Sequence, residues 1–378
     1  MKVAGKLKVV FIHPEVRDYR VDVLNRLSEE YDFTFMVIYE KTDVESYPDR
    51  ERWNYQTFGF HVKVPGTNRA FPPAVFTKIL FGDYDVIIAS DTTTVESMLA
   101  FAAAKLSGKK FVLWNELWDY PPLLRFSVIK PLVKFMARKS DALIAAGSKA
   151  RQLYMSFGAS KEKIFVAPNC AVDYGKIKTG NLREKLGLEG KKVVLYLGRI
   201  VAYKGLDYLL QAFAKLEGEI SDVSLVVGGS GPFEGECKSI AEELGIRNIV
   251  WAGYVKNVAS YYQLCDVFVL PARFIRDSVP SEAWGLVLNE VMSVGKPVVA
   301  TSAVAAAYDL IEDGVNGFMV EEKNADALAD ALRIILSDDG LAESMGRESR
   351  RILDAQYTYD KMFEGFRKAV EHAVKPKP

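Results

Sequence analysis

Two segments in the second half of the chain place charged residues beside glycines, at spacings that suit a phosphorylated ligand. The first runs from Gly198 to Gly205, with Arg199 and Lys204 between an apolar run and a helical pattern. Glycine lets a phosphate approach the backbone closely, while helix N-terminal amides and two cations can balance its charge. The alternative is an ordinary loop with two exposed, solvated cations, and this segment alone does not decide between the two interpretations.

The second segment spaces two glutamates, Glu282 and Glu290, eight residues apart, with Gly285 between them. If a helix begins near Gly285, Glu290 lies about one and a half turns into it, and Glu282 in the preceding loop can face the same ligand. The amides of Gly285, Leu286 and Val287 are then donors for a diphosphate, and the carboxylates can accept hydrogen bonds from sugar hydroxyls. The spacing alone, however, favours two solvated glutamates.

Both segments lie within a regular alternation of short apolar runs and helical patterns. Continuous apolar strands separated by helices are typical of parallel sheets that are covered on both faces. Two such series, joined near residues 173–180, predict two doubly wound domains whose ligands bind beyond the carboxyl ends of the strands, in a cleft between facing domains. The first series covers residues 8–13, 33–39, 85–90, 111–115, 142–146 and 164–168, and the second covers residues 193–197, 224–228, 249–253, 267–271, 297–301 and 317–320.

Together these motifs resemble the C-terminal half of the family 4 glycosyltransferases, which are retaining enzymes of the GT-B fold. The resemblance covers about residues 193–320 and includes Tyr-x-Gly-Arg and Lys-Gly (196–205), Gly-Gly-Ser-Gly-Pro (228–232), Glu-x7-Glu (282–290) and Gly-Lys-Pro-Val-Val (295–299). It implies an α/β GT-B fold with two Rossmann-like, doubly wound domains facing each other across a cleft. Residues 1–175 are then the acceptor-binding domain, residues 176–355 the nucleotide-sugar donor-binding domain, and residues 356–378 a helix that crosses back to the first domain.

The resemblance also implies roles for individual residues. Arg199 and Lys204 would hold the donor diphosphate. Glu290 would bind the ribose hydroxyls, and Glu282 would contact the transferred sugar. The predicted catalytic residues are Arg199, Lys204 and Glu282, and the donor contacts are completed by Gly198, Gly285, Leu286 and Val287.

The implied activity is the transfer of a sugar, with retention of configuration, from a nucleotide-diphosphate donor to a hydroxyl acceptor, as in a hexosyltransferase (EC 2.4). The acceptor would be a glycolipid, a polysaccharide or a lipid-linked glycan precursor. Positive potential from Arg199 and Lys204 can stabilise the leaving diphosphate, so we expect neither a metal ion nor a cofactor. Two alternatives stay open, namely a nucleotide-sugar epimerase of similar fold and a non-catalytic nucleotide-sugar-binding regulator. The second is supported by Ala305 and Ala306, which replace a Gly-Gly pair usual in the family and disfavour a positive φ.

Other motifs that could suggest different chemistry are incomplete. The chain has three histidines and three widely spaced cysteines, which predict neither a metal site nor a disulfide framework. Asp83 and Asp85 imitate a metal-binding Asp-x-Asp, but they precede a strand and should be structural. The glycines at 229 and 231 lack the third glycine of a dinucleotide fingerprint, because residue 234 is Glu234.

Acceptor-side residues should follow strands of the first domain. His13 ends the first predicted strand, and Glu116 follows the strand that contains Trp114. We predict that both His13 and Glu116 lie on the acceptor side. For His13, an equally weighted alternative is that it only caps the end of the strand. Aromatic residues beside a carboxylate suit sugar binding, but at least one nearby tryptophan should belong to the core.

Charge is unevenly distributed along the chain. Residues 1–180 hold 26 Lys and Arg against 20 Asp and Glu, and the remaining residues hold 23 against 29. The basic half leaves room for an anionic partner, but the excess of positive charge is too small for nucleic acid, and no nucleic-acid-binding module is recognisable.

The segment from Leu123 to Lys139 alternates apolar residues with cations and has no acid, so it could cover a sheet or lie on an anionic membrane. No apolar run is long enough to span a bilayer. We therefore expect a cytoplasmic protein that can bind peripherally to the inner face of the membrane.

Overall fold

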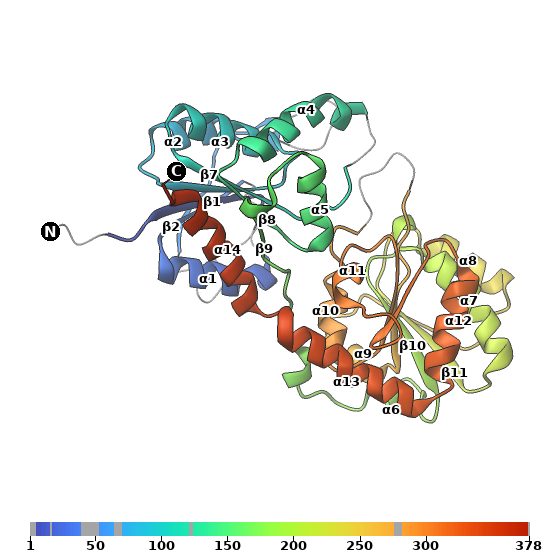
Figure 1. The fold of residues 1–378 in the computed structure, drawn as a ribbon. Helices are drawn as coiled ribbons and strands as arrows, with labels where there is room; N and C mark the ends of the chain where they lie inside the picture. Colours follow the sequence, from blue (N-terminus) through green and yellow to red (C-terminus); the bar gives the residue numbers. More distant parts are fainter. Residues whose placement is uncertain are drawn as a thin grey trace. The chain divides into compact units, whose positions relative to one another are not determined.

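The computed structural model describes residues 5–15, 17–38, 53–63, 70–120, 124–275 and 282–376. The chain divides into two compact units, Met1–Pro168 with Tyr359–Pro378, and Asn169–Thr358 (Figure 1). We call them the first and the second unit and describe each by itself.

The first unit is built on a parallel sheet of seven described strands in the order β3-β2-β1-β6-β7-β8-β9. Its strands are β1 (Lys8–His13), β2 (Asp32–Val37), β3 (Asn54–Gln56), β6 (Val86–Ser90), β7 (Lys110–Asn115), β8 (Ala142–Ala145) and β9 (Ile164–Val166), with a separate antiparallel pair β4 (Val62–Lys63) and β5 (Ala70–Phe71). Its helices are η1 (Asp18–Arg20), α1 (Val21–Glu30), α2 (Ala74–Phe81), α3 (Val95–Leu106), α4 (Leu124–Lys139), α5 (Ser148–Ser156), η4 (Lys161–Lys163) and α14 (Tyr359–Val374).

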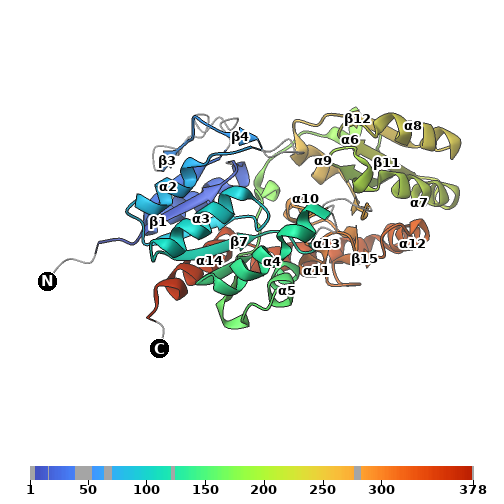
Figure 2. The same cartoon turned by 90° about the horizontal axis from the view of Figure 1, so that it is seen from above.

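Helices cover both faces of this sheet. One layer contains α2, α3 and α4, and the other contains α1 and the C-terminal helix α14, as Figures 1 and 2 show. Helix α14 packs on β7, β8 and β9 through buried side chains that include Met362 and Phe366. The ring of Phe366 lies 5.8 Å from that of Phe11 on β1 and 5.6 Å from that of Trp114 on β7. The C-terminal helix is therefore part of the core of the first unit.

The second unit has a parallel sheet of six described strands in the order β12-β11-β10-β13-β14-β15. They are β10 (Lys192–Leu197), β11 (Val223–Gly228), β12 (Ile249–Gly253), β13 (Val267–Leu270), β14 (Val298–Thr301) and β15 (Gly317–Val320). The helices are η5 (Tyr174–Lys176), α6 (Leu182–Lys185), η6 (Ala202–Lys204), α7 (Leu206–Glu219), α8 (Glu234–Glu243), α9 (Val258–Leu264), α10 (Val287–Met292), α11 (Ala307–Leu310), α12 (Ala325–Leu336) and α13 (Asp339–Gln356).

The sequence explains why these strands are central. Val193, Val194 and Leu195 of β10 are fully buried, and each such side chain contributes about 1.5–3 kcal/mol on burial. Helix α7 covers one face with Leu206, Leu209 and further apolar residues at helical spacing. Every strand predicted from the sequence is present, with ends shifted by at most two residues. The short strands β3, β4 and β5 were not predicted from the sequence.

Both sheets reverse their strand order once, between β1 and β6 in the first unit and between β10 and β13 in the second. The loops that leave neighbouring strands in opposite directions diverge at such a point and leave space for a ligand at the carboxyl edge. The loop after β10 carries Arg199 and Lys204, and the segment after β13 leads to Glu282. The predicted donor residues therefore belong to the two loops that flank the reversal in the second unit.

Candidate functional site

The loop after β10 is shaped by its contact with the segment after β13. Gly205 ends the short η6 turn with φ +68°, and a Cβ atom at this position would lie 1.9 Å from the carbonyl oxygen of Pro271. Only glycine fits such a close approach with a positive φ. Helix α7 begins at the next residue. The glycine singled out in the sequence thus lets the loop that carries the two cations rest directly on the neighbouring strand end.

Arg199 and Lys204 both lie beside the ring of Tyr203. Arg199 is exposed, and its Nη2 donates a hydrogen bond of 2.5 Å to the Tyr203 hydroxyl. The guanidinium carbon of Arg199 and the Nζ atom of Lys204 each lie 5.9 Å from the centre of that ring. We call Arg199 and Lys204, the two residues predicted to hold a diphosphate, the clamp, and the structure brings both of them to one aromatic side chain. Gly198, at the start of the loop, donates from its amide to the carbonyl of Gly228 at 3.0 Å.

Lys204 forms an ion pair with Glu282. The side chains are 12% and 15% exposed, respectively. The alternative interpretation, an ordinary loop with two exposed cations, therefore fits Arg199 but not Lys204. The reason is the tertiary contact with a carboxylate 78 residues away in the sequence, which the local pattern cannot reveal.

The segment that carries Glu282 is held by the loop after β14. Glu282 forms a bridge with Val304, and its carbonyl accepts from the Ala305 amide at 3.3 Å. The Ala306 amide donates to the carbonyl of Trp284 at 2.9 Å. Ala306 has an ordinary φ of −64°, and both alanines are buried. The two alanines that replace the usual glycines thus fit their loop without a positive φ, and their amides bind the backbone of the glutamate segment.

Helix α10 follows this segment and carries Glu290. Gly285 has φ +96°, and a Cβ atom there would lie 2.9 Å from the side chains of Leu270 and Val304. The helix begins at Val287, so Glu290 lies in its first turn. The helix begins two residues after Gly285, so the condition for placing Glu290 one and a half turns into it is not met.

The carboxylate of Glu290 accepts a hydrogen bond from the hydroxyl of the buried Tyr262. Burial raises the pKa of Glu290, and the hydrogen bond from Tyr262 opposes this shift. The amides of Gly285, Leu286 and Val287 donate to no acceptor among the described residues. The three amides are therefore without a protein acceptor among the described residues, whereas the carboxylate of Glu290 is held by Tyr262.

In the first unit, the two predicted acceptor-side residues lie around Trp114. His13 at the end of β1 stacks on this ring, with 5.4 Å between ring centres and 27° between planes. Glu116 forms an ion pair with Arg20, whose guanidinium carbon lies 4.1 Å from the centre of the same ring. Burial, followed by the charge of Arg20, lowers the pKa of His13 to about 4. Trp114 is a core residue, as expected for one of the tryptophans.

Two further residues at this edge were not predicted as site residues. Arg20 ends the Tyr-Arg pair that precedes α1; it is almost fully buried and links Glu116 to the Trp114 ring. Asp91 follows β6 with φ +68° and accepts hydrogen bonds of 2.8 Å from the amide and hydroxyl of Thr93. A non-glycine residue with positive φ is uncommon, and the sequence gives no signal for it.

The two aspartates that imitate a metal motif lie at the amino edge of the first sheet. Asp83 pairs with the ammonium group of Lys8, and Asp85 accepts from the amide of Lys8 at 2.8 Å. Within the ranges that the structure describes, no group of three His, Cys, Asp or Glu side chains could hold a metal ion. Nor does any described helix have the length and apolar character to cross a membrane.

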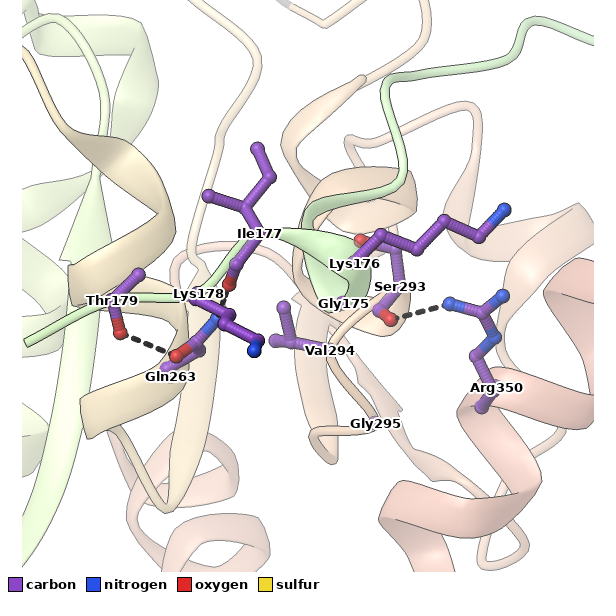
Figure 3. A pocket seen from close by; sticks show the side chains of 10 residues that line it. All are labelled: Gly175, Lys176, Ile177, Lys178, Thr179, Gln263, Ser293, Val294, Gly295 and Arg350. Atoms are coloured by element: carbon purple, nitrogen blue, oxygen red, sulfur yellow. Dashed lines mark hydrogen bonds between the residues drawn. The ribbon is translucent and has the colours of Figure 1, made fainter.

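A pocket of about 710 Å³ opens elsewhere in the second unit (Figure 3). It lies between the segment 175–179, Gln263 of α9, the turn 293–295 and Arg350 of α13. Arg350 donates to the carbonyl of Ser293 at 2.7 Å and is paired with Asp173. None of the predicted site residues lines this pocket, which borders the turn that precedes β14 rather than the carboxyl edge.

The segment that carries these loops is similar to a known protein family. Residues 178–352 match the family model of the glycosyl transferases group 1. Among similar proteins, the alpha-D-kanosaminyltransferase of Streptomyces kanamyceticus is 29% identical over 253 residues, which are 64% of each chain. A GDP-mannose-dependent alpha-(1-6)-phosphatidylinositol monomannoside mannosyltransferase of Mycobacterium tuberculosis is 24% identical over 308 residues, 79% of this chain and 80% of that protein. The match thus spans less than two thirds of the kanosaminyltransferase.

Solved structures extend the likeness to the whole fold. HepE of Anabaena in complex with UDP superposes with a TM-score of 0.79 at 18% identity, over 97% of this chain and all of that chain. A glycosyltransferase from Rickettsia africae gives the same TM-score at 16% identity, over 99% of this chain and all of that one. The predicted α/β class with two Rossmann-like sheets is confirmed, and the chain has the fold of the GT-B glycosyltransferases.

Proposed function

We propose that the protein is a retaining glycosyltransferase of family 4, which transfers a sugar from a nucleotide-diphosphate donor to a hydroxyl acceptor. The observation that carries this proposal is the pair of cations Arg199 and Lys204 on the loop after β10. Lys204 is held by an ion pair with Glu282, and all three residues lie in the segment that matches the group 1 family. Solved structures of HepE contain UDP, UDP together with glucose, or UDP-glucose, which supports a nucleotide-sugar donor for a chain of this fold. The proposed donor site is Gly198, Arg199, Lys204, Glu282, Gly285, Leu286, Val287 and Glu290.

The proposed reaction places negative charge on the diphosphate as the bond to the anomeric carbon breaks. Arg199 and Lys204 would stabilise that charge, because fixed cations act most strongly where charge develops in the transition state. The acceptor oxygen would form the new bond on the same face of the sugar, and its proton would pass to an oxygen of the departing phosphate. Atoms and charge balance in this step without a protein base, a metal ion or a cofactor.

Glu282 and Glu290 would have different tasks. Glu282 would bind the sugar that moves, since it already lies against Lys204 of the clamp. Glu290 would bind the ribose hydroxyls with the carboxylate that Tyr262 orients. His13 and Glu116 are proposed to contact the acceptor from the first unit.

A lipid-linked acceptor and an anionic membrane surface are the second part of the proposal. Helix α4 buries Val133 and Met136 in the core of the first unit. The apolar residues Val128, Leu132 and Phe135 nevertheless remain 72%, 41% and 50% exposed. Their spacing places them along one side of the helix. Covering the sheet therefore explains the buried apolar side chains of α4 but not the exposed apolar stripe formed by Val128, Leu132 and Phe135.

Cations accompany the exposed stripe of α4, which has no acidic residue. Each cation near an anionic surface contributes about 1 kcal/mol to membrane binding. We expect binding to anionic vesicles to weaken with salt and in the variant Lys130→Glu/Lys134→Glu, and to be lost in Val128→Ser/Phe135→Ser. The matched control is Leu244→Ser, an apolar residue of the second unit that is 41% exposed. Equal binding by all four proteins would contradict the membrane part of the proposal.

Nucleotide release tests the transfer activity itself. The purified protein would be incubated with UDP-, GDP- and ADP-sugars, with and without saccharide or lipid-linked acceptors. Release that depends on an acceptor supports transfer, whereas conversion of the donor to its epimer without an acceptor would support the epimerase alternative. Binding without any turnover would support a regulator. A bound donor at 100 times its Kd should add about 2.7 kcal/mol to the free energy of unfolding, so a thermal-shift screen selects the donor first.

A further inference from the structure

Arg273 belongs to none of the motifs that mark the site, yet it contacts the clamp loop from the neighbouring strand end. It is the third residue after β13, and its side chain is 17% exposed. Strands β10 and β13 are paired at the point where the sheet reverses its order. The segment that contains Arg273 thus forms one wall beside the loop of Arg199 and Lys204.

Arg273 contacts the chain on both sides of Lys204. The backbone amide of Arg273 donates to the carbonyl of Tyr203 at 2.8 Å, and its Nε donates to the carbonyl of Ala202 at 2.8 Å. Its Nη1 lies 3.0 Å from Oδ2 of Asp207, in the first turn of α7. Lys204 lies between these two points of attachment.

The surroundings leave the guanidinium little freedom. Its central carbon lies 5.1 Å from the ring centre of Tyr208 and 6.0 Å from that of Phe233. Asp207 is also buried; burial raises the pKa of Asp207, and the charge of Arg273 opposes that shift. Two donors in a fixed plane serve two acceptors at once, which a lysine ammonium on a flexible chain cannot reproduce.

We propose that Arg273 is a positioning residue, which fixes the turn of Lys204 so that the clamp is already in place when the diphosphate binds. This inference rests on the proposed function. Catalysis by fixed charges depends on their position, and a displacement of about 1 Å can cost about 100-fold in rate. Arg273 acts through Lys204 and is not assigned a contact with the donor.

The test compares Arg273→Lys with a matched control, Arg183→Lys. Arg183 makes the same kinds of contact, with Nε to the carbonyl of Leu264 at 2.8 Å and Nη2 to Asp266 at 2.7 Å. Those partners precede β13, at the edge opposite to the clamp. We expect Arg273→Lys to lower kcat/KM by about 10- to 100-fold and Arg183→Lys to change it less than threefold.

A double-mutant cycle with Lys204→Ala separates positioning from general stability. If Arg273 acts through Lys204, Arg273→Lys should cost almost nothing further in a Lys204→Ala background. Full additivity of the two losses, or equal losses in Arg273→Lys and Arg183→Lys, would overturn the inference. If Arg273→Lys does not fold, Arg273→Met/Asp207→Asn removes both charges together and is used in the same cycle.

The activity of the wild-type protein distinguishes failure of the proposed function from failure of the positioning role of Arg273. Wild type that neither binds nor turns over any nucleotide sugar refutes the proposed function. An active wild type with an equally active Arg273→Lys refutes only the positioning role.

Discussion

Replacing Lys204 by alanine removes one of the two cations that the proposed reaction places at the leaving diphosphate. Loss of one preorganised group at a developing anion typically lowers kcat by about 100- to 1,000-fold, or about 2.7–4 kcal/mol. Lys204 is fixed by Glu282 and by the turn before Gly205, so its loss removes a preorganised charge. We therefore expect turnover by Lys204→Ala to fall by at least 100-fold.

The same change should lower stability, because the ion pair is largely buried. With Lys204 and Glu282 at 12% and 15% exposure, alanine leaves a carboxylate unpaired, and breaking a buried pair costs about 3–5 kcal/mol. Residual solvent access at Glu282 favours the lower value. About 3 kcal/mol corresponds to a decrease in Tm of about 10 °C for a domain of this size. The variant Lys204→Met/Glu282→Gln removes both charges, so it should regain most of this stability and none of the activity.

Differential scanning fluorimetry and acceptor-dependent nucleotide release measure the two effects separately. The control is Lys215→Ala, which removes an exposed lysine of α7 that pairs with Asp326 and should alter neither quantity, since surface ion pairs contribute little. Folded Lys204→Ala with turnover within threefold of wild type would refute the clamp. Unchanged Tm in the same variant would refute the importance of the ion pair.

The other predictions concern the remaining site residues. Arg199→Ala should lower turnover by about 100-fold with an unchanged Tm, because Arg199 is exposed; equal turnover would exclude it from the clamp. Glu290→Gln should raise KM for the donor and leave kcat nearly intact, since a ribose contact hardly changes during bond cleavage; a selective loss of kcat would contradict this. Activity should survive EDTA, and a loss that Mg²⁺ or Mn²⁺ restores would require a metal. The native pKa of His13 is about 4 and the unfolded value about 6.5, so the unfolded chain binds the extra proton between these values. The free energy of unfolding should fall as pH decreases through that window, and a His13→Gln variant with the same pH dependence would contradict this.

The arrangement of strands could be predicted from the sequence because central strands of a covered parallel sheet have no polar face. Runs such as Val86–Ser90 and Val223–Gly228 are buried along their whole length, so their boundaries coincide with changes in hydropathy. The strands that were missed are two or three residues long, and the side chains of β3 and β4 are exposed or half-buried. Their pairing depends on a neighbouring chain segment, and nothing in their own composition marks it.

The candidate site was predictable only where a local motif encodes it. Gly205 and Gly285 mark backbone positions with positive φ, and the charged residues beside them could be read from their spacing. Arg273 and Tyr262 lie outside these motifs, and only the packing of the sheet brings Arg273 to the turn that contains Lys204 and Tyr262 to Glu290. A spacing rule describes neighbours along the chain, whereas these contacts join loops from different strands.

The ion pair between Lys204 and Glu282 suggests why the proposed clamp uses two cations in such different surroundings. The ion pair with Glu282 fixes the ammonium group of Lys204 before any ligand arrives, so a diphosphate would meet a cation that needs no reorganisation. That pair is neutral as a whole, however, and a diphosphate brings further negative charge. Under the proposed function, the exposed Arg199 supplies the additional positive charge, while Lys204 and Glu282 together set the position of the bond that breaks.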